Sequence, residues 1–155
     1  MPKVTAILNE ANTSLEEKLT AVCRLLKEEV INYDWVGFYF AQAETKTLHL
    51  KAFAGIPTEH TIIPFGKGIC GQVALSNENF VVENVQDQNN YISCNIDVKS
   101  EIVIPLFLNN SNIGQIDIDS NTLNAFSDSD VQLLEQINKL ISDHMLSNKI
   151  SINIS

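Results

Sequence analysis

The chain has 155 residues, of which 45% are hydrophobic and 19% are charged, so it is long enough for one packed core and too short for two. Ten Lys and Arg against nineteen Asp and Glu give a formal net charge of −9, and an acidic surface repels nucleic acids and anionic membranes. The longest apolar run, Ile102 to Leu108, is far shorter than the roughly 20 residues that cross a bilayer. We therefore expect a single domain over residues 1–155, with its core at about 14–147 and with neither nucleic acid nor membrane as a partner.

The N-terminal segment has scattered apolar residues and no cleavage site after a hydrophobic block. We therefore expect no signal peptide, and we expect a cytoplasmic location. Three cysteines, Cys23, Cys70 and Cys94, form an odd set in a chain too large to need disulfide cross-links. We expect no structural disulfide framework, and each cysteine has to be interpreted separately.

The first predicted element is an amphipathic helix over about 14–31. Ser14 followed by Glu17 matches a capping box, and apolar residues then recur at spacings of three and four. Cys23 lies at the edge of this apolar stripe, where a free cysteine packs as a small hydrophobe. We expect Cys23 in the core.

Strand patterns dominate the middle of the chain, because β-branched and aromatic residues are dense there or alternate with polar residues. The predicted strands are 34–41, 47–53, 61–63, 80–83, 101–108 and 112–118. Turn residues join the first two strands, and the last two, as hairpins. A glycine-rich loop, FGKGICG, leads into a short helix that ends at about Leu75.

A polar run over 84–100 is too irregular for regular structure and too long for a simple connector, which favours a functional loop. Ser127 and Asp130 match a second capping box, at the start of a helix with one apolar face, and the tail ISINIS after it is expected to fray. The order of elements indicates an α+β fold, an antiparallel sheet with N- and C-terminal helices packed on one face.

Two cysteines lie on glycine-rich or irregular backbone. Cys70 follows Gly68 at the predicted helix start, near Lys67, and a helix N-terminus with a cation stabilises a thiolate. Local electrostatics therefore predicts Cys70 as the more reactive thiol, with tight packing between glycines as an equal alternative. Cys94 lies on no apolar stripe, so we favour a functional role over core filling.

A cluster of acids is expected on the sheet. Asp117 and Asp119 alternate with Ile116 and Ile118, so both carboxylates point to one face of a strand, and Glu101 opens the facing strand. Adjacent like charges are destabilising unless a cation or a shared proton offsets them. We favour a site that binds an amine or holds a proton over a solvated outer face.

Trp35 and Tyr39 share a face of the first strand; such aromatics are most often core residues but also line small-ligand pockets. His49, His60 and His144 have no ligand spacing to one another or to the cysteines, so no metal site is expected. The glycine-rich loop lacks the Lys-Ser/Thr ending of a phosphate-binding loop.

Taken in order, DWVGFYF, IPFGKGICGQVA, the Cys94 loop, SEIVIP and IGQIDIDS resemble the GAF domains of the free methionine-(R)-sulfoxide reductases. The resemblance covers about residues 32–140 and implies a six-stranded antiparallel sheet with helices on one face and a ligand cavity on the other. It also implies free methionine sulfoxide as substrate, no bound cofactor, and thioredoxin or another thiol as reductant.

The resemblance assigns the nucleophile to the loop cysteine seven residues before the Glu of SEIV, which is Cys94. Thiolate attack with proton donation from Glu101 leaves a sulfenic acid, which a second cysteine converts to a disulfide. His60 stands where relatives carry the usual resolving cysteine, so Cys70 is the remaining resolving candidate. We prefer Cys94 over Cys70 as nucleophile because Glu101 can supply the proton.

The resemblance further implies that Glu101, Asp117 and Asp119 bind the substrate's ammonium group and manage the sulfoxide oxygen, beside an aromatic wall of Trp35 and Tyr39. The alternative is a non-catalytic GAF sensor that binds an amine or amino acid and acts on a partner in trans. A homodimer through the terminal helices is compatible with either function.

Overall fold

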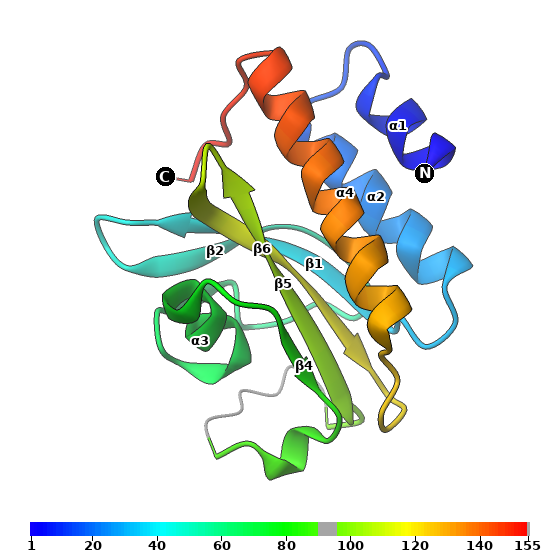
Figure 1. Cartoon of the computed structure of the whole chain (residues 1–155), viewed down its shortest axis with the longest axis vertical. Coiled ribbons are helices and arrows are strands. Elements are labelled where there is room, and N and C mark those ends of the chain that lie inside the picture. Colours follow the sequence, from blue (N-terminus) through cyan, green and yellow to red (C-terminus); the bar gives the residue numbers. More distant parts are fainter. Residues whose placement is uncertain (90–95, 155) are drawn as a thin grey trace.

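A computed structural model gives the structure of the chain and describes residues 1–89 and 96–154. Six antiparallel strands form one sheet in the order β3-β2-β1-β6-β5-β4. Helices α1, α2 and α4 lie on one face of the sheet, and α3 lies on the other (Figure 1). The predicted α+β architecture is confirmed.

The elements run in chain order as α1 (Pro2–Leu8), α2 (Leu15–Glu29), β1 (Trp35–Gln42), β2 (Thr47–Ala54), β3 (Ile62–Pro64), α3 (Gly68–Ser76), β4 (Phe80–Val82), a 3₁₀ helix η1 (Val85–Asp87), β5 (Ser100–Leu108), β6 (Ser111–Ser120) and α4 (Asp128–Ser147). Among the helices in the described ranges, none combines the length and the apolar character that crossing a membrane requires.

Both predicted capping boxes are present at the starts of the long helices. The backbone N–H of Glu17 donates to Ser14 Oγ at 3.1 Å, and the backbone N–H of Ser127 donates to Asp130 Oδ2 at 2.8 Å. These bonds satisfy donors that the first helical turn leaves without partners. They explain why the starts of α2 and α4 follow from the sequence.

Two hydrophobic clusters cover the two faces of the sheet, because successive residues of a strand point to opposite sides. Val36, Phe38 and Ile118 belong to the cluster under the long helices, and Trp35 and Val103 belong to the other. The central strands are therefore buried on both faces, with β5 buried over its first seven residues. Polar side chains on the second face are held away from bulk water.

Cys23 is fully buried in the helix-side cluster, as expected of a core residue. Burial raises the pKa of its thiol, so the group is uncharged and unreactive near neutral pH. Because Cys23 and Cys70 belong to the clusters on opposite faces, the sheet lies between these two thiols.

Three segments differ from the sequence-based expectations. Helix α1 was not predicted, since its seven residues bury only Val4 and Leu8, too few for a periodic signal. The polar run contains η1, where Asn84 Oδ1 accepts from the backbone N–H of Gln86 at 3.1 Å. The tail has no helix or strand at 151–154, but its partly buried isoleucines pack against the helix-side core.

Candidate functional site

The strand register brings three of the predicted site residues into one row across the sheet. Trp35 on β1 pairs with Asp119 on β6, and Asp119 pairs with Glu101 on β5. Asp117 lies two residues before Asp119 and therefore points to the same face. This face is the one opposite the long helices, so the three acids meet as the alternation of β6 predicts.

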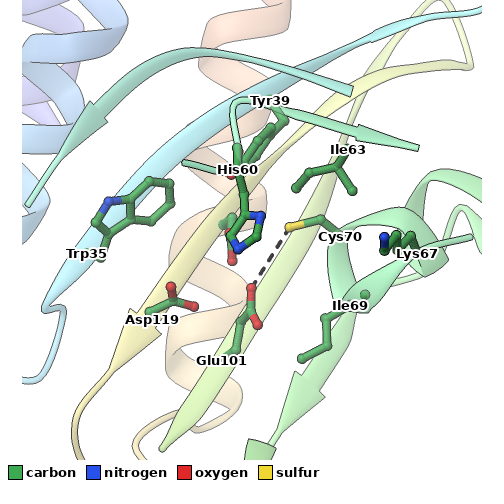
Figure 2. A pocket seen from close by; sticks show the side chains of 11 residues that line it. Trp35, Tyr39, His60, Ile63, Lys67, Ile69, Cys70, Glu101 and Asp119 are labelled. Atoms are coloured by element: carbon green, nitrogen blue, oxygen red, sulfur yellow. Dashed lines mark hydrogen bonds between the residues drawn. The ribbon is translucent and has the colours of Figure 1, made fainter. Parts of the chain in front are cut away.

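A cavity lies between this face and the start of α3 (Figure 2). Its lining combines aromatic, acidic and thiol side chains: Trp35, Tyr39, His60, Ile63, Lys67, Gly68, Ile69, Cys70, Glu101, Asp117 and Asp119. The cavity volume is about 20 Å³, which is room for about one water molecule. Six of the seven site residues predicted from the sequence therefore line one narrow space.

The seventh, Cys94, lies outside the described residues, within the segment 90–95. Its assignment as nucleophile therefore rests on the resemblance. The segment lies between η1 and β5 in the chain, and Glu101 is the second residue of β5.

Cys70 is the third residue of α3 and is 5% exposed. Its sulfur lies 3.9 Å from Glu101 Oε2. The sulfur and one carboxylate oxygen each from Glu101 and Asp117 all lie within 4.8 Å of one another. Folding therefore gives Cys70 two acidic neighbours that are distant in sequence.

The helix start and Lys67, which were expected to stabilise a Cys70 thiolate, do not lower the pKa of this thiol in the folded protein, and the comparison of its reactivity with that of Cys94 stays a prediction. Burial raises the pKa of Cys70 well above its ordinary value, and the nearby carboxylates of Asp117 and Glu101 raise it further. Lys67, the cation expected to favour the thiolate, has an exposed side chain, where water screens its charge. The Cys70 thiol consequently stays protonated in the folded protein at neutral pH.

Asp117 is 4% exposed, and burial raises the pKa of its carboxyl group, while hydrogen bonding with Glu101 and Cys70 lowers it. Its Oδ1 atom is buried and has no hydrogen-bond partner among residues 1–89 and 96–154. A buried carboxylate oxygen of this kind favours either a proton or a cationic ligand.

An aromatic wall closes one side of the cavity. Trp35 Nε1 donates to the carbonyl oxygen of Ile56 at 3.0 Å, and its ring stacks on Phe53 with centroids 6.0 Å apart and planes at 14°. Gly37 leaves room for the indole, since a Cβ atom there would lie 2.3 Å from the ring. Sequence analysis missed Gly37, although a glycine inside a strand indicates such close approach.

His60 was given no role from the sequence, although the resemblance aligns it with the usual resolving cysteine. It lies between β2 and β3, where its carbonyl oxygen accepts a hydrogen bond from the Tyr39 hydroxyl at 2.9 Å. Figure 2 shows its imidazole projecting into the cavity between Trp35 and Cys70. An imidazole therefore occupies the part of the site where the resemblance leads one to expect a thiol.

The expectation that no metal site exists rested on ligand spacing along the chain. The described residues nevertheless contain a buried group of three potential ligands, Cys70, Glu101 and Asp117. Strand pairing and the position of α3 bring these residues together in a way that spacing in the sequence does not reveal, and the expectation that no metal is bound stays a prediction.

The GAF domain family matches residues 12–145 of the chain. GAF domain-containing protein A of Dictyostelium discoideum is 36% identical over 143 residues, which are 92% of this chain and 88% of that protein. Free methionine-R-sulfoxide reductase of Saccharomyces cerevisiae is 34% identical over 142 residues, which are 90% and 76% of the two chains.

The solved structures include a free methionine-R-sulfoxide reductase from Neisseria meningitidis in complex with its substrate. It superimposes with a TM-score of 0.87 at 31% identity, covering 96% of this chain and 87% of that chain. The chain therefore belongs to the GAF domain family and, within it, to the free methionine-R-sulfoxide reductases, which are oxidoreductase enzymes.

Proposed function

We propose that this protein reduces free L-methionine-(R)-sulfoxide to methionine, with Cys94 as the attacking thiol and Cys70 as the resolving thiol. The observation that carries the substrate assignment is the buried row of acids beside an aromatic wall. Glu101, Asp117 and Asp119 line the same cavity as Trp35. The names of the similar enzymes support the same substrate class.

Substrate recognition follows from charge. The ammonium group of a free amino acid offsets the acids of the cavity, whereas the amide nitrogen of a peptide-linked residue carries no charge. The apolar methyl group fits against the Trp35 indole. The cavity therefore selects a free amino acid over a methionine sulfoxide residue within a polypeptide.

A free amino acid needs more space than about 20 Å³, so binding requires movement of the cavity wall. His60 is only half-buried and lies in an irregular connection. Rotation of its imidazole away from Glu101 enlarges the cavity without breaking the sheet. We propose that this rotation accompanies substrate entry.

The first chemical step transfers oxygen from the substrate to the enzyme. The Cys94 thiolate attacks the sulfoxide sulfur while Glu101 in its acid form protonates the oxygen. The oxygen moves to Cys94 as a sulfenic acid, and methionine departs as the thioether. The substrate sulfur gains two electrons, and the Cys94 sulfur loses them.

The second step uses Cys70. Its sulfur attacks the Cys94 sulfenic acid, a disulfide forms and water leaves with the sulfenic oxygen. Because the Cys70 thiol is protonated in the resting protein, it suits the second attack better than the first. Asp117 hydrogen-bonds to Cys70 and is our candidate to accept the thiol proton.

The last step is thiol–disulfide exchange. Thioredoxin, or a small dithiol in its place, donates two electrons to the Cys70–Cys94 disulfide and restores both thiols. Formation of that disulfide requires the two Cα atoms to come within about 7 Å.

Purified reduced protein should convert free methionine-(R)-sulfoxide to methionine with dithiothreitol or a thioredoxin system as reductant. Cys94→Ser should abolish turnover. Cys70→Ser should still release one methionine per chain in a single turnover but should lose steady-state activity with thioredoxin. Cys23→Ala, which changes a core thiol on the other side of the sheet, is the matched control and should keep activity.

Activity that survives Cys94→Ser would eliminate Cys94 as the nucleophile. If the protein binds the sulfoxide but converts neither epimer to methionine, the result would instead favour a GAF sensor that acts on a partner in trans. Mass spectrometry after a single turnover separates a Cys70–Cys94 disulfide from a persistent Cys94 sulfenic acid.

A further inference from the structure

Three potential metal ligands at the base of the cavity have the spacing of a coordination site. The sulfur of Cys70 and a carboxylate oxygen from each of Glu101 and Asp117 lie within 4.8 Å of one another, and all three residues are buried. The sulfur lies 3.9 Å from Glu101 Oε2. Zinc–sulfur and zinc–oxygen bonds of about 2.3 and 2.0 Å at a tetrahedral angle place sulfur and oxygen about 3.5 Å apart. A small contraction would therefore bring the three atoms onto one ion.

The buried Oδ1 atom of Asp117 is a second observation that a cationic ligand would account for. The residue is 4% exposed, lines the cavity, and keeps a buried Oδ1 atom that no other described residue hydrogen-bonds. Leaving such an oxygen unsatisfied costs free energy. A cation bound at the cavity floor would remove that cost.

His60 supplies a fourth donor of a suitable kind. Its imidazole projects into the cavity near Cys70 and Glu101 (Figure 2), and its half-buried position leaves room for adjustment. Thiolate, imidazole and carboxylate together are the ligand types of zinc, whereas magnesium and calcium prefer oxygen ligands alone. The donor set therefore selects a borderline-soft divalent cation.

We propose that the cavity binds one Zn²⁺ or similar borderline-soft divalent cation through Cys70, Glu101 and Asp117, with His60 as the fourth ligand. The Cys70 thiol releases its proton to the solvent as the metal–sulfur bond forms, and no electron is transferred. About one proton therefore leaves Cys70 for each ion bound, together with any proton that Glu101 or Asp117 holds in the metal-free protein. The ion fills the space in which the proposed substrate would bind, so the two compete.

The test is an optical titration of the reduced protein with Co²⁺ in the presence of a reductant that is not a thiol. A cobalt–thiolate charge-transfer band should grow and saturate at one ion per chain, and added Zn²⁺ should displace the cobalt and remove the band. Cys70→Ser should abolish the band. Asp117→Asn should weaken cobalt binding by more than the roughly 10- to 100-fold that loss of an outer-shell partner costs, and His60→Ala should weaken it while the band remains.

Cys23→Ala and Cys94→Ser are the controls that keep the Cys70 ligand, and both should retain the band at one ion per chain. If Cys70→Ser does not fold, Asp117→Asn and His60→Ala still test the site, because both keep the thiol. The emission of Trp35 reports whether each variant is folded. A missing band, or a band that is lost in Cys94→Ser and kept in Cys70→Ser, would overturn the proposal.

The optical titration needs no turnover, so its outcome is independent of the proposed function. A protein that reduces methionine sulfoxide but shows no cobalt–thiolate band would refute the metal site alone. A protein that binds one cobalt ion but does not reduce the sulfoxide would refute the proposed function alone.

Discussion

At the scale of single residues, burial and the acidic side chains of β5 and β6 decide the protonation state of Cys70. The carboxylates of Glu101 and Asp117 have oxygens within 4.8 Å of its sulfur, and Coulomb interactions are strong at such distances when water is excluded. The helix N-terminus and Lys67 act in the opposite direction, but Lys67 is exposed. Burial, reinforced by the two acids, therefore prevails and keeps the thiol protonated until another group removes its proton.

Gly37 offers a clean test of the aromatic wall, because Trp35 is the only tryptophan in the chain. In Gly37→Ala the new Cβ would lie 2.3 Å from the indole, so the ring must move. We expect the free energy of unfolding to fall by about 1–3 kcal/mol and the fluorescence emission of Trp35 to shift as the ring leaves its buried position. An unchanged emission spectrum with unchanged stability would show that the indole does not lie over Gly37.

At the scale of elements, the contact between α3 and the end of β3 positions the thiol. A Cβ atom at Gly71 would lie 2.7 Å from the carbonyl oxygen of Pro64, so only glycine lets the helix approach this closely. Gly68 starts the helix with φ of +66°, a conformation that favours glycine. These two glycines are the reason that Cys70 reaches the acids of β5 and β6.

Gly71→Ala should therefore displace α3 from β3. We expect the free energy of unfolding to fall by about 1–3 kcal/mol and Cys70 to react faster with iodoacetamide, because the displaced helix exposes its thiol. Peptide mass mapping measures the labelling at Cys70 separately from the other cysteines. Gly37→Ala is the matched control, since it should change Trp35 emission more than Cys70 labelling; equal labelling in both variants would contradict the role of Gly71.

Patterns that repeat within one element could be predicted from the sequence. The alternation around Asp117 and Asp119 places both acids on one face, and the capping boxes at Ser14 and Ser127 mark two helix starts. The expected hairpin also places Glu101 opposite the two aspartates, but contacts between elements that are not paired in a hairpin could not be predicted from local patterns. The entry of His60 into the cavity and the acidic surroundings of Cys70 follow from strand register and from the docking of α3, which no local pattern encodes.

For the whole molecule, the sheet separates stability from chemistry. The larger hydrophobic cluster lies on the helix side, and burial of apolar side chains is the dominant favourable contribution to folding. The opposite face carries buried acids, whose ionisation opposes folding. The helix side thus stabilises a fold that tolerates an unfavourable charge cluster on its other side.

This division predicts how stability depends on pH. Burial raises the pKa of Asp117 above its ordinary value of 3.8, so above pH 3.8 the folded state keeps a proton that the unfolded chain has released. A folded state that binds more protons loses stability as the pH rises, by about 1.4 kcal/mol per pH unit for one group within the affected range. Asp117→Asn cannot ionise and escapes this loss.

Urea unfolding of the wild type and of Asp117→Asn, compared from pH 4 towards neutrality, measures the effect. The hydrogen bonds that the variant loses lower its free energy of unfolding by an amount that changes little with pH. The informative quantity is therefore the slope of the free energy of unfolding against pH, and the variant should gain stability relative to the wild type as the pH rises. Glu44→Gln, at an exposed position in the turn between β1 and β2, is the matched control. Its free energy of unfolding should depend on pH as that of the wild type does. If the free energy of unfolding of Asp117→Asn shows the same pH dependence as the wild type, Asp117 ionises as freely in the folded protein as in the unfolded chain. The acidic cluster would then not oppose folding in the way that its burial indicates.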